Sequence, residues 1–210
     1  MASTETILRE TLALYKKMGI RAVTMDMVAE KLGMSKRTLY EQFPNKNDLI
    51  NACLQLDMNE MKENAIKELG NSKNILEKIV SFMFFHINII KQYSPNFLYD
   101  LNKYYLELSC EKTADFYLTM TNKIVGLIET GKKEQLFRND INSEIAAKLV
   151  LEQFKYIHNE TLFPAEKYSH TKIFEHIAIT FIRGIATLKG YELIEEYYTK
   201  YKNSEQFNDN

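Results

Sequence analysis

The sequence has few residues that interrupt helices. Of its 210 residues, only 3 are proline and 7 are glycine. Because these two residues are the strongest breakers of regular structure, the long stretches between them favour long helices over many short strands. We therefore expect an all-α protein.

Cysteine is scarcer still, with 2 residues. Cys53 and Cys110 are far apart and form no C-x-x-C pair. This usage is typical of a reducing compartment and gives no support for a disulfide framework or a metal site. We expect two structural thiols and no bound metal.

Long apolar runs are also missing. The longest, from Ile79 to Ile90, is interrupted by His86 and Asn88, so it is shorter than the roughly 20 apolar residues that cross a bilayer. The N-terminus shows no basic stretch followed by an apolar segment, as a secretory signal would. We expect a cytoplasmic protein with a buried helix at this position and no membrane segment.

Composition and charge are otherwise ordinary. Hydrophobic residues make up 45% and charged residues 26% of the chain, as in folded domains and unlike disordered or fibrous proteins. The net charge of −1 divides into 8 basic against 6 acidic residues over 1–50 and 19 against 22 beyond. The mild basic excess at the N-terminal end is consistent with a local phosphate-binding surface.

Capping signals predict two helices at the start of the chain. Ser3 or Thr4 can cap a first helix that ends at Gly19, and Thr24 can cap a second that ends at Gly33. Side-chain oxygens satisfy the free N–H groups of a helix start, and glycine adopts the left-handed conformation of a helix end. The chain therefore predicts two helices within its first 33 residues.

The next segment predicts a sharp turn into a third helix. Gly33-Met34-Ser35 combines a glycine that tolerates positive φ with a serine that can cap the third helix. Leu39 and Phe43 are four residues apart and so point to one side, into the core. This is helix-turn-helix spacing. Pro44 is expected to end the third helix, and Asn45 to cap a fourth over 46–69.

These residues resemble the DNA-binding signature of TetR-family regulators. The stretch from Thr24 to Leu49 matches in register and without gaps, and with the first helix the resemblance covers about 5–54. It implies a three-helix DNA-binding domain over 1–50, joined to a larger helical ligand-binding and dimerisation bundle over 51–203. It also implies a homodimeric regulator, and repression rather than activation. The residues over 204–210 are mostly polar, and we expect them to form a polar tail.

The third helix carries most of the predicted DNA contacts. Its basic N-terminal turn would enter the major groove, with Arg37 as the leading candidate for a guanine contact. The resemblance places Thr24, Tyr40 and Lys46 on phosphates. Glu41 can either accept from cytosine or only cover the surface, and an ordinary solvated helix face would also explain these charges. The candidate DNA-binding residues are Thr24, Ser35, Lys36, Arg37, Thr38, Tyr40, Glu41 and Lys46.

Beyond residue 70 only periodicity is informative. Helices are expected near 73–92, 95–108, 110–134, 143–163 and 171–190, with a short terminal helix over 191–202. This region is rich in aromatic residues, which can line an apolar cavity or simply pack as a core. The candidates that line the cavity are Phe82, Phe84, Phe85, Tyr93, Phe97, Tyr99, Tyr104, Tyr105, Phe116, Tyr117 and Phe154, with His86, Asn88 and His158 as polar groups.

From this set we expect an unidentified small effector, apolar or amphipathic, and no other cofactor. Its predicted contacts are Phe85, Phe116, Met120, Phe154 and His158. For the two histidines, a satisfied place in the core is the favoured alternative.

Two apolar stripes are candidates for dimerisation. One recognition helix reads few base pairs, so half-sites about one DNA turn apart demand two copies. The stripes can equally be internal core. Their residues are Ile145 and Leu149 on one, and Ile177, Phe181, Gly184 and Leu188 on the other.

The sequence gives no support for the usual helical classes of enzyme. The residues three before the four histidines are Met83, Lys155, Lys167 and Ile173, whereas a di-iron bundle needs glutamate there. There is no zinc-protease motif, phosphate loop or nucleophile elbow. A bundle that has lost DNA binding is the remaining alternative, and intact Lys36, Arg37, Tyr40 and Lys46 speak against it.

Overall fold

The computed structural model describes residues 3–70, 72–105, 114–159 and 161–204. The described residues form helices and no strand, apart from one isolated bridge between Phe137 and Ala186. The all-α prediction is confirmed. No helix among the described residues has the length and apolarity required of a membrane span.

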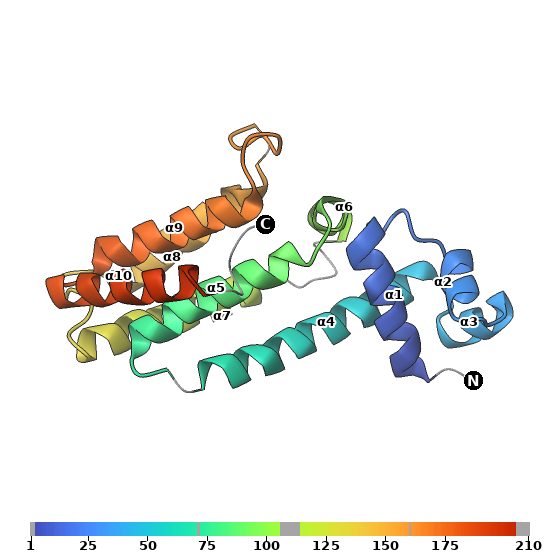
Figure 1. Cartoon of the computed structure of the whole chain (residues 1–210), viewed down its shortest axis with the longest axis horizontal. Helices are drawn as coiled ribbons and strands as arrows, with labels where there is room; N and C mark the ends of the chain where they lie inside the picture. The colour runs from blue at the N-terminus through green and yellow to red at the C-terminus, as the bar shows by residue number, and fades with distance from the viewer. Residues whose placement is uncertain (1–2, 71, 106–113, 160, 205–210) are drawn as a thin grey trace. The chain divides into compact units, whose positions relative to one another are not determined.

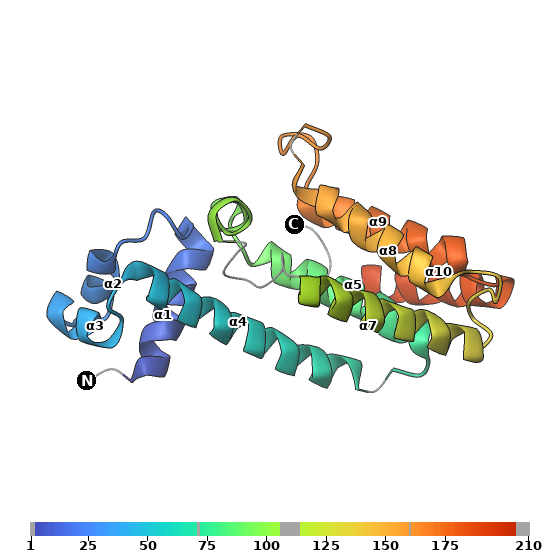
Figure 2. The same ribbon diagram turned by 180° about the vertical axis from the view of Figure 1, so that it is seen from behind.

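The chain packs as two compact units (Figures 1 and 2). The head unit comprises Met1–Asn64 with Gln92–Lys112, and the bundle unit comprises Ala65–Lys91 with Thr113–Asn210. The head unit is thus larger than the 1–50 expected for the DNA-binding domain, because a later segment packs with it. The functional division at residue 50 stays a prediction.

The head unit begins with three capped helices. They are α1 (Thr4–Met18), α2 (Met25–Lys31) and α3 (Lys36–Gln42). Ser3, Thr24 and Ser35 each accept a hydrogen bond from the backbone N–H three residues on. Gly19 and Gly33 have φ of 94° and 61°, the left-handed region that glycine adopts without strain. The caps read from the sequence therefore set these helix boundaries.

α4 (Lys46–Leu69) is continuous and runs from the head unit into the bundle unit. Its start carries the Asn45 cap expected from the sequence. The side chain of Asn45 accepts from the Asp48 N–H at 3.0 Å and donates to the Asp48 carboxylate at 2.8 Å. The predicted range 46–69 is confirmed.

A later segment completes the head. α6 (Pro95–Asp100) continues into the π-helix η1 (Leu101–Tyr105) and packs on α1. Phe97 is 1% exposed in the same core as Ile7, Leu39 and Leu49. Tyr93 and Tyr105 pack against that core too.

The placement of these aromatic residues corrects the sequence-based set. Tyr93, Phe97 and Tyr105 serve the head instead of lining a cavity in the bundle, and Tyr99 and Tyr104 are more than 40% exposed. The aromatic periodicity could not reveal this, because it does not say which unit a helix joins.

The described residues of the bundle unit form five long helices. They are α5 (Ile75–Lys91), α7 (Ala114–Lys133), α8 (Ser143–Lys155), α9 (His170–Ile185) and α10 (Leu188–Lys202). α5 packs on α10, α7 on α8, and α8 on α9. Leu76, Ile128 and Ile194 are at most 2% exposed at the centre of this core.

Two predicted helices end earlier than expected. The helix expected over 143–163 stops at Lys155 and passes into the 3₁₀ turn η2 (Tyr156–His158). The helix expected over 171–190 stops at Ile185, because the Ile185 carbonyl accepts from Arg138 and Thr187 donates to Leu136. Thr187 then caps α10 through the Gly190 N–H at 3.1 Å.

Candidate DNA-binding surface and effector region

Helix α3 is anchored to the head core by one of its faces. Leu39 is fully buried and Phe43 is 7% exposed in the head core. At its start, the Ser35 hydroxyl accepts from the Thr38 N–H at 3.1 Å. The Met34 N–H donates to the Ala29 carbonyl at 3.0 Å and closes the turn from α2. The opposite face of α3 is consequently free to meet another molecule.

The predicted DNA-contacting side chains lie on that free face and beside it. Ser35, Lys36, Arg37, Glu41 and the cap Thr24 are exposed. Thr38 is partly buried and Tyr40 is 46% exposed. All of these side chains are thus at least partly accessible, as contact with a DNA groove requires.

Two carboxylates accompany the cations of α3. Lys36 Nζ lies 2.6 Å from Asp26 Oδ2 on α2, and Arg37 Nε lies 3.0 Å from Glu41 Oε1 one turn along α3. The second pair has the i, i+4 spacing at which side chains meet on a helix, but the sequence analysis did not predict it. The first pair joins two helices, so only the fold could reveal it.

Lys46 is set at the start of α4. Its ammonium donates to the Arg21 carbonyl at 3.3 Å. Burial lowers the pKa of Lys46, while the nearby Asp100 carboxylate opposes that shift. The Arg21 guanidinium stacks 4.5 Å from the Tyr104 ring centroid and donates to its hydroxyl at 3.0 Å. The positive helix end and two cations thus gather at this edge of the head.

Among the predicted effector contacts, three side chains are described. Phe85, Met120 and Phe154 are all partly buried. The side chains of Phe116 and His158 lie outside the described residues. The five positions remain predictions.

A row of rings links three bundle helices. The His86 ring on α5 lies 4.6 Å from Phe174 on α9, which stacks 5.1 Å from Phe154 on α8. Phe82 stacks on His86 at 6.2 Å. Burial lowers the pKa of His86 to about 4, so its imidazole is neutral at pH 7. Phe174 belongs to this group and was missed, because its period-four spacing on α9 resembles ordinary core.

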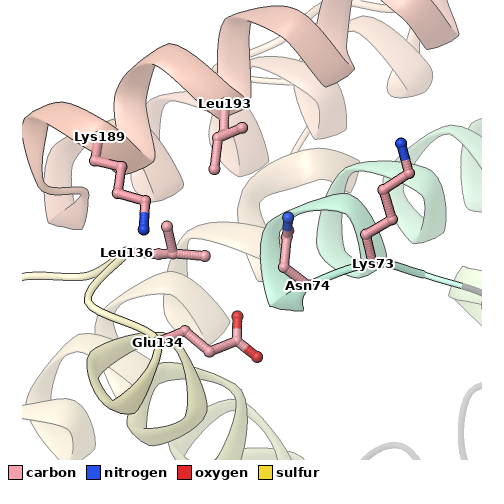
Figure 3. Close-up of a pocket in the computed structure, with 6 residues that line it drawn as sticks. All are labelled: Lys73, Asn74, Glu134, Leu136, Lys189 and Leu193. Atoms are coloured by element: carbon pink, nitrogen blue, oxygen red, sulfur yellow. The ribbon is translucent and has the colours of Figure 1, made fainter.

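A separate hollow lies at the other end of the bundle unit (Figure 3). It has a volume of about 450 Å³. Two of its polar side chains already make hydrogen bonds within the fold: Glu134 accepts from the Ile75 N–H at 2.9 Å, and Asn74 donates to the Tyr197 hydroxyl at 2.8 Å. No predicted effector contact lines it. The lining residues are Lys73, Asn74, Glu134, Leu136, Lys189 and Leu193.

The six predicted dimer residues are accessible in a single chain. Ile145 and Leu149 on α8 are 57% and 58% exposed. Gly184 is exposed, with open space where a Cβ would lie, and Ile177 and Phe181 beside it on α9 are partly buried. Leu188, placed by the sequence on the same helix, begins α10 and is 79% exposed. Their role in dimerisation remains a prediction.

Acidic, histidine and cysteine side chains do not gather into a metal-binding group within the described ranges. Of the two cysteines, Cys53 is buried, with a thiol whose pKa is raised by burial to about 12. Cys110 lies outside the described residues.

Comparisons with known proteins agree with the helix-turn-helix. The model of the family "Bacterial regulatory proteins, tetR family" matches residues 7–53. The uncharacterized HTH-type transcriptional regulator YvaF of Bacillus subtilis is 28% identical over 182 residues, covering 85% of this chain and 93% of that relative.

Solved structures share the fold. A putative regulator from Saccharomonospora viridis in complex with choline has a TM-score of 0.65 at 21% identity, over 86% of this chain and 96% of that one. FadR from Bacillus subtilis in complex with stearoyl-CoA has a TM-score of 0.61 at 15% identity, over 87% and 100%. The family model thus matches the helix-turn-helix segment of this chain, and the likeness to the solved structures shows that the chain shares their fold.

Proposed function

We propose that the chain is a homodimeric repressor that leaves its operator when a small apolar or amphipathic molecule binds the bundle unit. The observation that carries the DNA-binding part is the capped helix α3, which presents Lys36, Arg37 and Tyr40 outward while Leu39 anchors it. Donors of this kind read base edges and phosphates in a major groove.

Dimerisation is supported by the apolar surface of α8 and α9. Large apolar side chains such as Ile145 and Leu149 cost free energy when water covers them, and Gly184 permits close approach of a second helix. A two-fold pair of chains presents two recognition helices to two half-sites, which multiplies sequence specificity.

An effector is supported by the ring row of Phe82, His86, Phe154 and Phe174. Aromatic faces with one neutral hydrogen-bonding ring suit a molecule that is mostly apolar and carries a polar group. The two solved structures are complexes, one with choline and one with stearoyl-CoA. Each of these molecules joins an apolar or methylated part to a polar part. Such a molecule changes DNA affinity only by binding the two conformations unequally.

The test has two stages. Thermal shift with long-chain acyl-CoAs, fatty acids, alkylamines and choline identifies a stabilising compound. An electrophoretic shift on the DNA upstream of the chain's own gene then measures whether that compound releases the protein. Phe154→Ala and Phe174→Ala should abolish the stabilisation, whereas Phe163→Ala, in the loop after α8, should not. Binding that leaves DNA affinity unchanged contradicts the effector proposal and spares the DNA-binding function.

A further inference from the structure

The outer face of α3 carries a carboxylate where DNA is expected. Glu41 is 60% exposed and belongs to the same helix as Lys36 and Arg37. In a groove bordered by phosphates, an isolated carboxylate opposes binding by like-charge repulsion. A carboxylate on this face therefore needs either a cation that compensates its negative charge or a function of its own in DNA binding.

The structure supplies the partner. Arg37 Nε donates to Glu41 Oε1 at 3.0 Å. The Arg37 side chain is 89% exposed, so nothing else in the described head restrains it. In water an exposed i,i+4 pair of this kind adds little stability. Its effect is instead directional, because the guanidinium is a rigid fork whose orientation is fixed once one N–H is engaged.

The nitrogen of Arg37 that pairs with Glu41 decides which of the remaining N–H groups can donate to a base. With Nε engaged, the two terminal Nη groups of Arg37 form no hydrogen bond with the described residues and remain available as donors. Two parallel donors are what the O6 and N7 acceptors of guanine require. Thr38 and Ser35 are hydrogen-bonded to each other at 2.8 Å and do not compete for the guanidinium.

We propose that Glu41 is a positioning residue for Arg37, which fixes the guanidinium for bidentate contact with one guanine and so determines base preference without touching a base. This inference rests on the proposed contact surface of α3. It favours a supporting role for Glu41 over the direct acceptance of a hydrogen bond from cytosine.

A double-mutant cycle tests the proposal in the full-length protein. Wild-type protein first selects duplexes from a random-sequence library, and the guanine whose preference is lost in Arg37→Ala is identified. Dissociation constants for the selected duplex, and for one with that G·C pair replaced by A·T, are then measured for wild type, Arg37→Ala, Glu41→Gln and the double variant.

Glu41→Gln should lower the guanine preference about fivefold in the wild-type background and by less than about twofold once Arg37 is alanine. Glu41→Asp keeps the charge but shortens the side chain, and should lose the preference like Glu41→Gln. Glu30→Gln, which removes one charge from an exposed position of α2, is the matched control and should leave the ratio of the two constants unchanged.

Three outcomes overturn the inference. An equal loss of preference in both backgrounds means that Glu41 reads a base itself. A gain in affinity for both duplexes with an unchanged ratio means that it only repels phosphates. A Glu41→Asp variant that keeps the wild-type guanine preference means that the negative charge at position 41 is sufficient and that the length of the side chain does not determine the preference. If wild-type protein selects no sequence at all, the proposed contact surface fails as well, which separates the two failures.

Discussion

The hydroxyl of Tyr93 donates to the buried carboxylate of Asp57 at 2.8 Å, and Lys16 Nζ lies 2.6 Å from the other oxygen of that carboxylate. Three parts of the chain, α1, α4 and the segment after α5, therefore meet at one ion-paired group. Asp57 is only 6% exposed, so each partner compensates for a carboxylate removed from water.

Removing the tyrosine hydroxyl should weaken the head. Tyr93→Phe deletes one hydrogen bond to a buried charge and should lower the free energy of unfolding by about 1–2 kcal/mol. Urea unfolding followed by circular dichroism measures it. Tyr191→Phe, at a 44% exposed position, is the control and should change stability by less than about 0.5 kcal/mol. Equal effects of both variants would refute a structural role for this contact.

The DNA contacts should divide into two kinds. Arg37→Ala should weaken the preferred duplex by about 1–3 kcal/mol and relax preference at one base pair. Lys46→Ala should weaken all duplexes alike and reduce the salt slope of log K by about one. Fluorescence anisotropy over a range of salt concentrations distinguishes them, with the exposed Lys62→Ala as control. Identical losses on every sequence would contradict the division.

Two glycines should respond in opposite directions to alanine. At Gly190 a Cβ would lie 2.1 Å from the Leu136 carbonyl oxygen, so α10 would have to move away from the chain after α7. At helical Gly126 nothing lies within 4 Å of that position. Gly190→Ala should cost about 2 kcal/mol or more, and Gly126→Ala should stabilise by about 0.5–1 kcal/mol. Thermal unfolding measures both, and a stabilised Gly190→Ala would contradict the packing.

The proposed dimer surface can be tested by introducing a charged side chain into it. Leu149→Glu on α8 would place a carboxylate in the proposed apolar interface and should weaken the dimer at least about 100-fold, because a charge without a partner is costly to bury. Ile66→Glu, at a 73% exposed position of α4, should leave the dimer intact. Sedimentation velocity across a dilution series gives the dissociation constants. A dimer that survives Leu149→Glu would place the interface elsewhere.

His86 should make the bundle sensitive to mild acid. Burial lowers the pKa of His86 from 6.5 to about 4, so between these values the unfolded chain binds a proton that the folded chain does not. Stability should therefore fall as pH drops from 6.5 toward 4, by about 2–3 kcal/mol from this group. His86→Phe should flatten that part of the pH profile of urea unfolding, and the exposed His176→Gln should not. Parallel profiles for wild type and His86→Phe would refute this.

Local signals predicted the head more completely than the bundle. Ser3, Thr24, Ser35 and Asn45 act within one helical turn, so the sequence alone could place the starts of the first four helices. The break after Ile185 depends on backbone hydrogen bonds to Leu136 and Arg138, about 50 residues away. Periodicity cannot register such a contact, and the predicted helix over 171–190 was wrong at its end for that reason.

Prediction of the candidate site was limited in the same way, because features set within one helix could be predicted and contacts between helices could not. The exposed face of α3 could be predicted because Leu39 and Phe43 fix which side is buried. The partner of Lys36 could not, since Asp26 lies ten residues earlier on another helix. Nor could Phe174, whose ring meets those of His86 and Phe154 only after three helices assemble.

The burial of Phe97 in the head core has a consequence for synthesis on the ribosome. The first 54 residues contain all the helices of the DNA-binding motif, yet their core is completed only by a side chain more than forty residues later. A nascent chain that has exposed only its helix-turn-helix still leaves the Phe97 site open to water. The head can therefore reach its final packing only after the segment through Tyr105 has left the exit tunnel, so a terminated fragment that stops before α6 should be a substrate for cellular proteases.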